Sequence, residues 1–319
     1  MLHQNFVFLL NADKTPLNPI HPARARELQN HFKSAVFRTY PYVLILKEQI
    51  ENPELIPIRL KIDPGSKYTG LALQRNNSII FLMELKHRGS VIKTNLQTRK
   101  GFRQGRRSRN LRYRRKRFNR KKPNSWLAPS LQHRVDTTET WIKRFQRYAP
   151  IEVVEIEQVR FDTQQLENPE IKGVEYQQGT LQGYETKFNR ITQGFAKTHS
   201  IDAACVGDSG EQITFLTNQP LLVDCRGHGN RQARRVNGSG FPAVKKAKIV
   251  YKHCIAGDIV QFTNLKARKN LALGKQTMRI KTPTAKGFEV QNAQGRTAIS
   301  SLTGVRFIHR NDGYSYRFG

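Results

Sequence analysis

One interior stretch of the chain, residues 86–135, carries 18 lysines and arginines and no aspartate or glutamate. Within it, residues 98–123 contain only scattered Leu, Tyr and Phe, so this segment cannot build a hydrophobic core of its own. Arginine is compatible with a helix, and it outnumbers lysine here, which favours bidentate contacts with phosphate. We therefore expect a basic helix neutralised by bound phosphates, rather than a disordered linker, between two folded parts of the chain.

A second basic block, residues 226–319, has 19 lysines and arginines against three acidic residues, while the formal net charge of the 319-residue chain is +31. The remainder is therefore close to neutral. Two polycationic regions on a near-neutral scaffold indicate a polyanionic partner. A membrane surface fits less well, because the basic runs lack the apolar face of an interfacial helix and no apolar stretch reaches the length of a membrane span.

The three cysteines, Cys205, Cys225 and Cys254, have no CxxC spacing. This pattern argues against a disulfide framework and against a four-cysteine zinc site. A zinc set made of Cys225, His228, His253 and Cys254 is also disfavoured, because an adjacent His-Cys pair has poor ligand geometry. We expect a protein of the reducing cytoplasm.

Hydrophobic periodicity gives a coarse outline of the elements. Alternating or short apolar runs predict strands at residues 5–10, 42–47, 58–62, 69–73, 78–85 and 151–157. Helical patterns occupy residues 21–37, 135–148 and 197–207. The middle helix has Asp136 and Glu139 at capping-box spacing, and Trp141, Ile142 and Phe145 on one face. Runs at 258–263, 277–282, 287–292 and 304–310 predict a small β-barrel or open sheet.

Three carboxylates stand at positions where rigid elements could present them together. Asp63 ends one strand, Glu157 ends another, and Asp202 lies three residues after His199 on one helix face. Hard oxygen ligands on rigid elements suit magnesium, and two Mg²⁺ ions about 4 Å apart can clamp a phosphodiester. His199 would then orient or deprotonate the attacking water. Separately, each residue has a structural alternative: Asp63 as a turn former, Glu157 on a solvated face, and His199 as a hydrogen bonder at a helix end.

The order of these elements resembles the ribonuclease H-like fold of RuvC nucleases. Five segments together resemble the IscB family of transposon-encoded RNA-guided nucleases: "KTPLNPIHPARAREL" (14–28), "IDPGSKYTGLAL" (62–73), the run from "EIEQVRFD" to "LQGYE" (155–185), "KTHSIDAACVG" (197–207) and "GHGNRQARR…GFP" (227–242). The implied fold class is α/β: a RuvC domain split by an arginine-rich bridge helix, with a small N-terminal α/β domain and a basic C-terminal β-rich domain.

The resemblance also implies roles for single residues. Asp63, Glu157, His199 and Asp202 would be catalytic, and the three carboxylates would hold two Mg²⁺ ions, for which Mn²⁺ can substitute. Nucleic-acid contacts would fall on Arg99, Lys100, Arg103, Arg106, Arg107, Arg109, Arg112, Arg114, Arg115, Arg117, Arg231, Arg234 and Arg235. The implied regions are residues 1–55, RuvC-I at 56–88, the bridge helix at 89–123, RuvC-II at 124–185, a linker at 186–196, RuvC-III at 197–224 and the basic domain at 225–319.

The chain departs from the family pattern in two places. Its N-terminal signature reads PLNP, with Asn18 where the usual form has methionine. Between Glu185 and Lys197 stand eleven residues, too few for the HNH nuclease of full-length members. The chain therefore resembles the shorter IsrB branch, which implies nicking of the non-target strand by a monomeric protein bound to a structured noncoding guide RNA. Its target would be double-stranded DNA with an adjacent motif, and the location that the resemblance implies is the prokaryotic cytosol or nucleoid.

Three other interpretations are compatible with the same sequence. An RNA-independent RuvC-like nuclease, such as a junction resolvase, would cut branched DNA without a guide. A nucleic-acid-binding protein could keep the fold without catalysis, although all three carboxylates are present. The C-terminal block could be an OB- or SH3-like RNA-binding barrel that reads no base.

Overall fold

The structure is a computed structural model, and it describes residues 4–108, 122–157, 183–227, 254–264, 271–284, 287–292, 295–300 and 304–319. The chain divides into two compact units. Unit 1 comprises Met1–Phe37, Tyr42–Asp224 and Tyr316–Gly319, and unit 2 comprises Arg38–Pro41 and Cys225–Ser315. The division cuts two strands of one sheet near their ends, β10 (Leu221–Cys225) and β16 (Tyr314–Phe318).

The N-terminal part forms a four-stranded sheet in the order β2-β1-β4-β3 and one helix. The bounds are Val7–Leu10 (β1), Pro16–Ile20 (β2), Pro22–Asn30 (α1), Ser34–Arg38 (β3) and Val43–Leu46 (β4). The helix predicted over residues 21–37 is therefore too long. Phe32 has a φ of +56°, which a helix cannot accommodate, and the chain then enters β3.

Asn18, the departure within PLNP, has a structural role in this sheet. It lies on the half-buried face of β2, while its neighbours Leu17 and Pro19 are buried. Its amide donates to the backbone oxygen of Glu54 (2.8 Å) and accepts from the backbone nitrogen of Ile56 (2.9 Å). The asparagine thus attaches the connection before the next strand, and it does not occupy the core.

The central sheet has the strand order β16-β10-β7-β6-β5-β8, with a short strand β9 paired to β7. The bounds are Ile58–Pro64 (β5), Tyr68–Arg75 (β6), Ser78–Lys86 (β7), Ile151–Ile156 (β8) and Thr214–Phe215 (β9). The strands predicted at residues 58–62, 69–73 and 78–85 are β5, β6 and β7, which form an antiparallel meander, and β8 runs parallel to β5. Because β10 is parallel to β7, the strands β5, β7, β8 and β10 end at one common edge.

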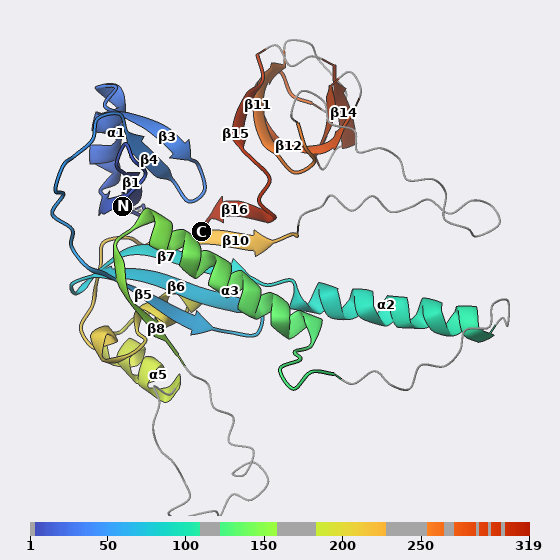
Figure 1. Ribbon diagram of the computed structural model, residues 1–319, viewed down its shortest axis with the longest axis horizontal. Helices are drawn as coiled ribbons and strands as arrows, with labels where there is room; N and C mark the ends of the chain where they lie inside the picture. The colour runs from blue at the N-terminus through green and yellow to red at the C-terminus, as the bar shows by residue number, and fades with distance from the viewer. Residues whose placement is uncertain are drawn as a thin grey trace, which may run out of the picture. The chain divides into compact units, whose positions relative to one another are not determined.

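Helices cover both faces of this sheet (Figure 1). On one face α3 (Pro129–Tyr148) places Phe145 against Phe81 of β7, with ring centroids 5.5 Å apart. On the other face the buried residues of α6 (His199–Ala204) pack with Ala72 and Leu82. Phe81 and Leu82 are neighbours in β7 and so point to opposite faces. Two short elements, α5 (Gly183–Thr192) and η1 (Asp208–Gly210), flank α6 in sequence.

The helix α3 begins earlier than its hydrophobic pattern predicts. Pro129 occupies its first turn, a favourable position for proline. Asp136 and Glu139 therefore lie inside the helix and form no capping box: Asp136 accepts from Gln132, and Glu139 pairs with Lys143. The predicted apolar face is only partly buried, since Trp141 and Phe145 are fully enclosed and Ile142 is half-exposed.

The basic stretch begins with α2 (Gly89–Ser108), which starts nine residues before the basic run 98–123 and at the first residue of the region 89–123 expected for the bridge helix. Residues 109–121 lie outside the described part of the chain. Unit 2 is built on an antiparallel sheet in the order β14-β13-β12-β11-β15, which curls around a common core (Figure 1). Its bounds are Ile259–Asn264 (β11), Gly274–Pro283 (β12), Phe288–Asn292 (β13), Gly295–Ile299 (β14) and Arg306–His309 (β15). No helix in the described ranges is long and apolar enough to cross a membrane.

Candidate active site

Two of the predicted carboxylates come from neighbouring parallel strands. Asp63 lies near the end of β5, and Glu157 directly follows β8. Ile62 pairs with Ile156, and the Glu157 backbone nitrogen donates to the Ile62 oxygen at 3.0 Å. Parallel pairing thus brings both carboxylates to the same sheet edge, where their side chains are hydrogen-bonded to each other.

The protonation of this pair is unusual. Burial, followed by the negative charges of Asp63 and Asp202, raises the pKa of Glu157 to about 7. Burial also raises the pKa of Asp63, with a contribution from Asp202 in the same direction. Only 7% of Glu157 is exposed, so water does little to stabilise the ionised form. Near neutral pH the two carboxylates therefore share a proton.

The third carboxylate is brought to this edge by a close approach between α6 and β6. Gly70 pairs with Asp63 across the β5–β6 ladder. A Cβ atom built on Gly70 would lie 1.7 Å from the backbone oxygen of His199 and 3.0 Å from the Cβ of Ala203. The helix can lie this close only because residue 70 has no side chain. Thr198 caps its N-terminus by accepting from the Ile201 nitrogen.

Asp202 forms an ion pair with an arginine of the same chain. Its Oδ1 lies 2.7 Å from Nε of Arg190 on α5, and both side chains are largely buried. Within the described part of the chain, Asp63, Glu157 and Asp202 do not form one of the groups of side chains whose ligand atoms converge closely enough to hold a metal ion. The structure therefore places the three acids at one edge but leaves Asp202 turned toward Arg190.

His199 lies at the first turn of α6 and is exposed to solvent. Its ring stacks on Tyr68 of β6, with centroids 5.0 Å apart and an interplanar angle of 16°. The positive charge that His199 can carry opposes the rise in the pKa of Asp63, which shows that the two side chains are near each other. The imidazole is thus positioned at the open side of the acidic cluster.

Lys61 is a part of the site that the sequence did not reveal. Its side chain is fully buried, and Nζ donates to the backbone oxygen of Ala204 at 2.9 Å. Burial lowers the pKa of Lys61 to about 8, opposed by Glu155, whose carboxylate lies 3.9 Å away. The ammonium group thus holds the C-terminal end of α6. Lys61 and Arg190 were missed because a lysine in an alternating strand and an arginine on a polar helix normally face solvent.

The basic helix presents its charge on one side over the described residues. Arg99, Lys100, Arg103 and Arg107 are exposed, as is Lys93. At 100° per residue these five positions span a sector of about 120° around the axis. Ile92 and Leu96 fall in the same sector and are half-buried near the start of α2. The backbone of Arg106 belongs to α2, whereas Arg109, Arg112, Arg114, Arg115, Arg117, Arg231, Arg234 and Arg235 lie outside the described residues.

The fold and site define a mixed α/β protein that gathers carboxylates at a sheet edge and carries an exposed basic helix. Residues 7–179, more than half of the chain, match the family described as RRXRR protein, and the chain belongs to this family. A search of curated proteins found no match.

Proposed function

We propose that this protein is an RNA-guided DNA endonuclease of the IscB type, related to the IsrB branch, that nicks the non-target strand of a DNA duplex. The RRXRR family is found in nucleases of this type. The observation that carries the proposal is the proton-sharing Asp63–Glu157 pair at the edge that also receives Asp202 and His199. A dication bound between these carboxylates would neutralise their charge and allow a polyanionic substrate to approach.

The donor set fits a divalent metal with oxygen ligands. The pKa values of Asp63 and Glu157 are raised because burial and neighbouring anions disfavour ionisation, and a dication would reverse this imbalance. Asp63 and Glu157 would hold Mg²⁺ or Mn²⁺, and Asp202 would join them after leaving Arg190. When bound, the metal supplies a lowered pKa of coordinated water and neutralisation of charge on the phosphodiester.

The chain's own groups would carry the remaining steps. His199 would accept a proton from the attacking water at an imidazole nitrogen, and its stacking on Tyr68 would fix the plane of the ring. Lys61 would keep α6, and with it Asp202 and His199, at a constant distance from β5. The exposed basic face of α2 would bind phosphates of the guide RNA or of the guide–target duplex, whose bases supply the sequence specificity.

The test is to express the full chain with its native flanking DNA, purify it through a high-salt wash, and sequence any RNA that stays bound. A single RNA with a constant structured part and a separable guide end is expected, and with Mg²⁺ the complex should nick a plasmid that carries the guide-matched target. Cleavage of branched DNA without RNA would instead support a structure-selective nuclease. Target binding without nicking would support a binding protein that lacks catalysis.

A further inference from the structure

A second group of metal-ligating side chains lies at the same sheet edge as the acidic cluster, and the proposed nuclease chemistry does not use it. His87 directly follows β7, His133 lies in the second turn of α3, and Cys225 is the last residue of β10. Asp224 of β10 pairs with Lys86 of β7, so Cys225 and His87 each follow a paired residue at the carboxyl ends of two parallel strands.

A buried hydrogen bond at one ring nitrogen orients the imidazole of His87. The other ring nitrogen has no hydrogen-bond partner. Its Nε2 lies 2.7 Å from the hydroxyl of Thr69 on β6, and the residue is only 7% exposed. Its Nδ1 is buried and has no hydrogen-bond partner. An unpaired buried polar atom is costly. The arrangement matches a metal ligand whose second nitrogen donates to a neighbouring oxygen.

His133, on α3, also has one ring nitrogen within hydrogen-bond distance of a threonine hydroxyl, which leaves the other nitrogen available to a metal. The Thr137 hydroxyl donates to the His133 backbone oxygen at 2.6 Å, so it can accept from Nδ1 of the ring, 3.3 Å away. Nε2 then carries the lone pair, and its contact with the backbone nitrogen of Arg88 is long, at 3.5 Å. The His87 and His133 ring centroids lie 6.3 Å apart, in an edge-to-face arrangement.

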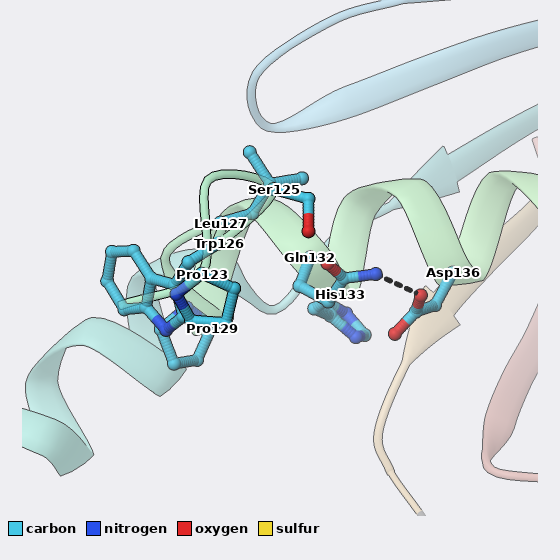
Figure 2. Close-up of a pocket in the computed structure, with 8 residues that line it drawn as sticks. All are labelled: Pro123, Ser125, Trp126, Leu127, Pro129, Gln132, His133 and Asp136. Carbon is cyan, nitrogen blue, oxygen red and sulfur yellow. Dashed lines mark hydrogen bonds between the residues drawn. The ribbon is translucent and has the colours of Figure 1, made fainter. Parts of the chain in front are cut away.

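The three side chains converge on one point. One ligand atom from each of His87, His133 and Cys225 lies within 4.8 Å of the other two. Ligand atoms on a tetrahedral zinc ion are about 3.3 to 3.8 Å apart, so a small rotation of the half-buried His133 and Cys225 side chains would close the set. His133 also lines a surface hollow, together with Trp126, Gln132 and other residues of the segment 123–136 (Figure 2).

The electrostatics of this cluster differ from those of the acidic site. Burial, followed by the positive charges that His133 and Arg134 can carry, lowers the pKa of His87 to about 4. Burial and the charge of Arg88 also lower the pKa of His133. Both imidazoles are therefore neutral at physiological pH, which is the form that binds metals. A nitrogen and sulfur donor set favours zinc over magnesium.

We propose that His87, His133 and Cys225 form a zinc site, with water or a further ligand in the fourth position. The ion would join β7, α3 and β10 at the base of the basic helix, because α2 begins at Gly89, two residues after His87. Its role would be to fix the direction in which α2 leaves the sheet. This assignment does not depend on nuclease activity.

The test measures metal bound to the purified full chain by mass spectrometry, before and after dialysis against excess ZnSO₄ and a wash with a weak chelator. We expect one zinc per chain in the wild type and less than a tenth of that in His87→Gln, His133→Gln and Cys225→Ser. His31→Gln, at an exposed histidine, and Asp63→Ala, at the acidic site, are matched controls that should keep full zinc content.

Cobalt substitution identifies the sulfur ligand independently of folding defects. The Co²⁺-loaded wild type should show a thiolate-to-cobalt charge-transfer band, and Cys225→Ser should lose that band while keeping a native circular dichroism spectrum. Wild-type protein that takes up no zinc after dialysis would overturn the proposal. Full zinc content in all three ligand variants would overturn it as well, because the ion would then lie elsewhere.

Discussion

The acidic cluster and the His–Cys cluster lie at the same edge of one sheet, but on opposite faces. Asp63 and Glu157 follow β5 and β8, whereas His87 and Cys225 follow or end β7 and β10. The acids face α6, and the histidines face α3. The first cluster has oxygen donors that resist losing protons, and the second has nitrogen donors that resist gaining them.

Strand β6 separates the two clusters, and two of its consecutive residues serve different sides. Thr69 holds the imidazole of His87 at 2.7 Å. Gly70, next to it, admits the backbone of α6 at His199. Because neighbouring residues of a strand point to opposite faces, one sheet edge can support two sites of different chemistry. The two clusters thus share one sheet edge, and their ligands lie on opposite faces of it.

The largest effect is expected from removing a carboxylate. Asp63→Ala should reduce Mg²⁺-dependent nicking by at least about 10³-fold, since a lost metal ligand removes several kcal/mol of transition-state stabilisation. Glu157→Ala and Asp202→Ala should behave alike. Zinc content should not change in any of them. Nicking rates on a guide-matched plasmid measure the effect, and Asp208→Asn, at an exposed acid, is the control. A wild-type rate in any of the three would remove that residue from the site.

The sequence made the acidic cluster predictable because its residues occur at the ends of recognisable elements. Asp63 follows an alternating run before a Pro-Gly turn, and Glu157 ends a short β-like run. The parallel direction of the pairing between β5 and β8 was established by the structure. The arrangement of Asp202 with Arg190 could not be predicted, because it depends on how α5 packs beside α6.

The His–Cys cluster could not be predicted for a related reason. Its residues are separated by 46 and 92 positions, so no local spacing joins them. Two of them meet only because β10 adds to the sheet beside β7, and the third because α3 crosses that face. Sequence patterns predicted most strands of the sheet, but the helix boundaries were wrong where Phe32 and Pro129 decide them.

Gly70→Ala tests whether the close approach of α6 maintains the acidic side alone. The new Cβ would overlap the His199 backbone oxygen, which cannot rotate away, so we expect a loss of at least about 2 to 3 kcal/mol in unfolding free energy. Nicking should fall further than stability explains, because Asp202 moves with α6. Gly101→Ala is the matched control: nothing lies within 4 Å of its Cβ position, and alanine favours a helix. Equal stability of the two variants in urea titrations would contradict the packing argument.

Thr69→Val tests the face of β6 opposite to Gly70, where the hydroxyl of Thr69 contacts the His87 ring. Valine preserves the shape of the buried side chain but cannot accept from the His87 ring, so zinc affinity should fall by about 10- to 100-fold. Competition with a chromogenic chelator measures this affinity. The Mg²⁺ dependence of nicking should stay as in the wild type. If Thr69→Val changed the magnesium dependence and left zinc affinity intact, the division of β6 between two sites would be wrong.

The two clusters should also affect stability with opposite pH dependence. Glu157 has a pKa of about 7 in the folded chain against an ordinary 4.5, so in metal-free protein its contribution to stability is present at low pH and is lost as pH rises through 7. His87, lowered to about 4, destabilises the fold as pH falls below about 6.5.

Glu157→Gln removes the acidic contribution. The variant should be more stable than metal-free wild type at pH 8 by about 1 to 2 kcal/mol, after allowance for solvent screening. At pH 4.5, where Glu157 is protonated in the folded chain, the difference should shrink toward zero. Urea titrations at both pH values provide the measurement. A stability gap that is independent of pH would show that Glu157 does not share a proton with Asp63.

The smallest effects are expected on α2, whose charge lies away from both clusters. Arg103→Gln and Arg107→Gln should each reduce the slope of log K against log salt for RNA binding by about 0.7 to 0.9, the change for one lost phosphate contact. The two residues are four apart and lie on one face, so the double variant should lose about twice as much. Arg26→Gln, on α1, should leave the slope unchanged. His87→Gln keeps every arginine of the helix, so it too should preserve the slope if zinc only directs α2. A lowered slope in His87→Gln would mean that α2 makes fewer phosphate contacts when zinc does not fix its base. Zinc binding and RNA binding would then be coupled.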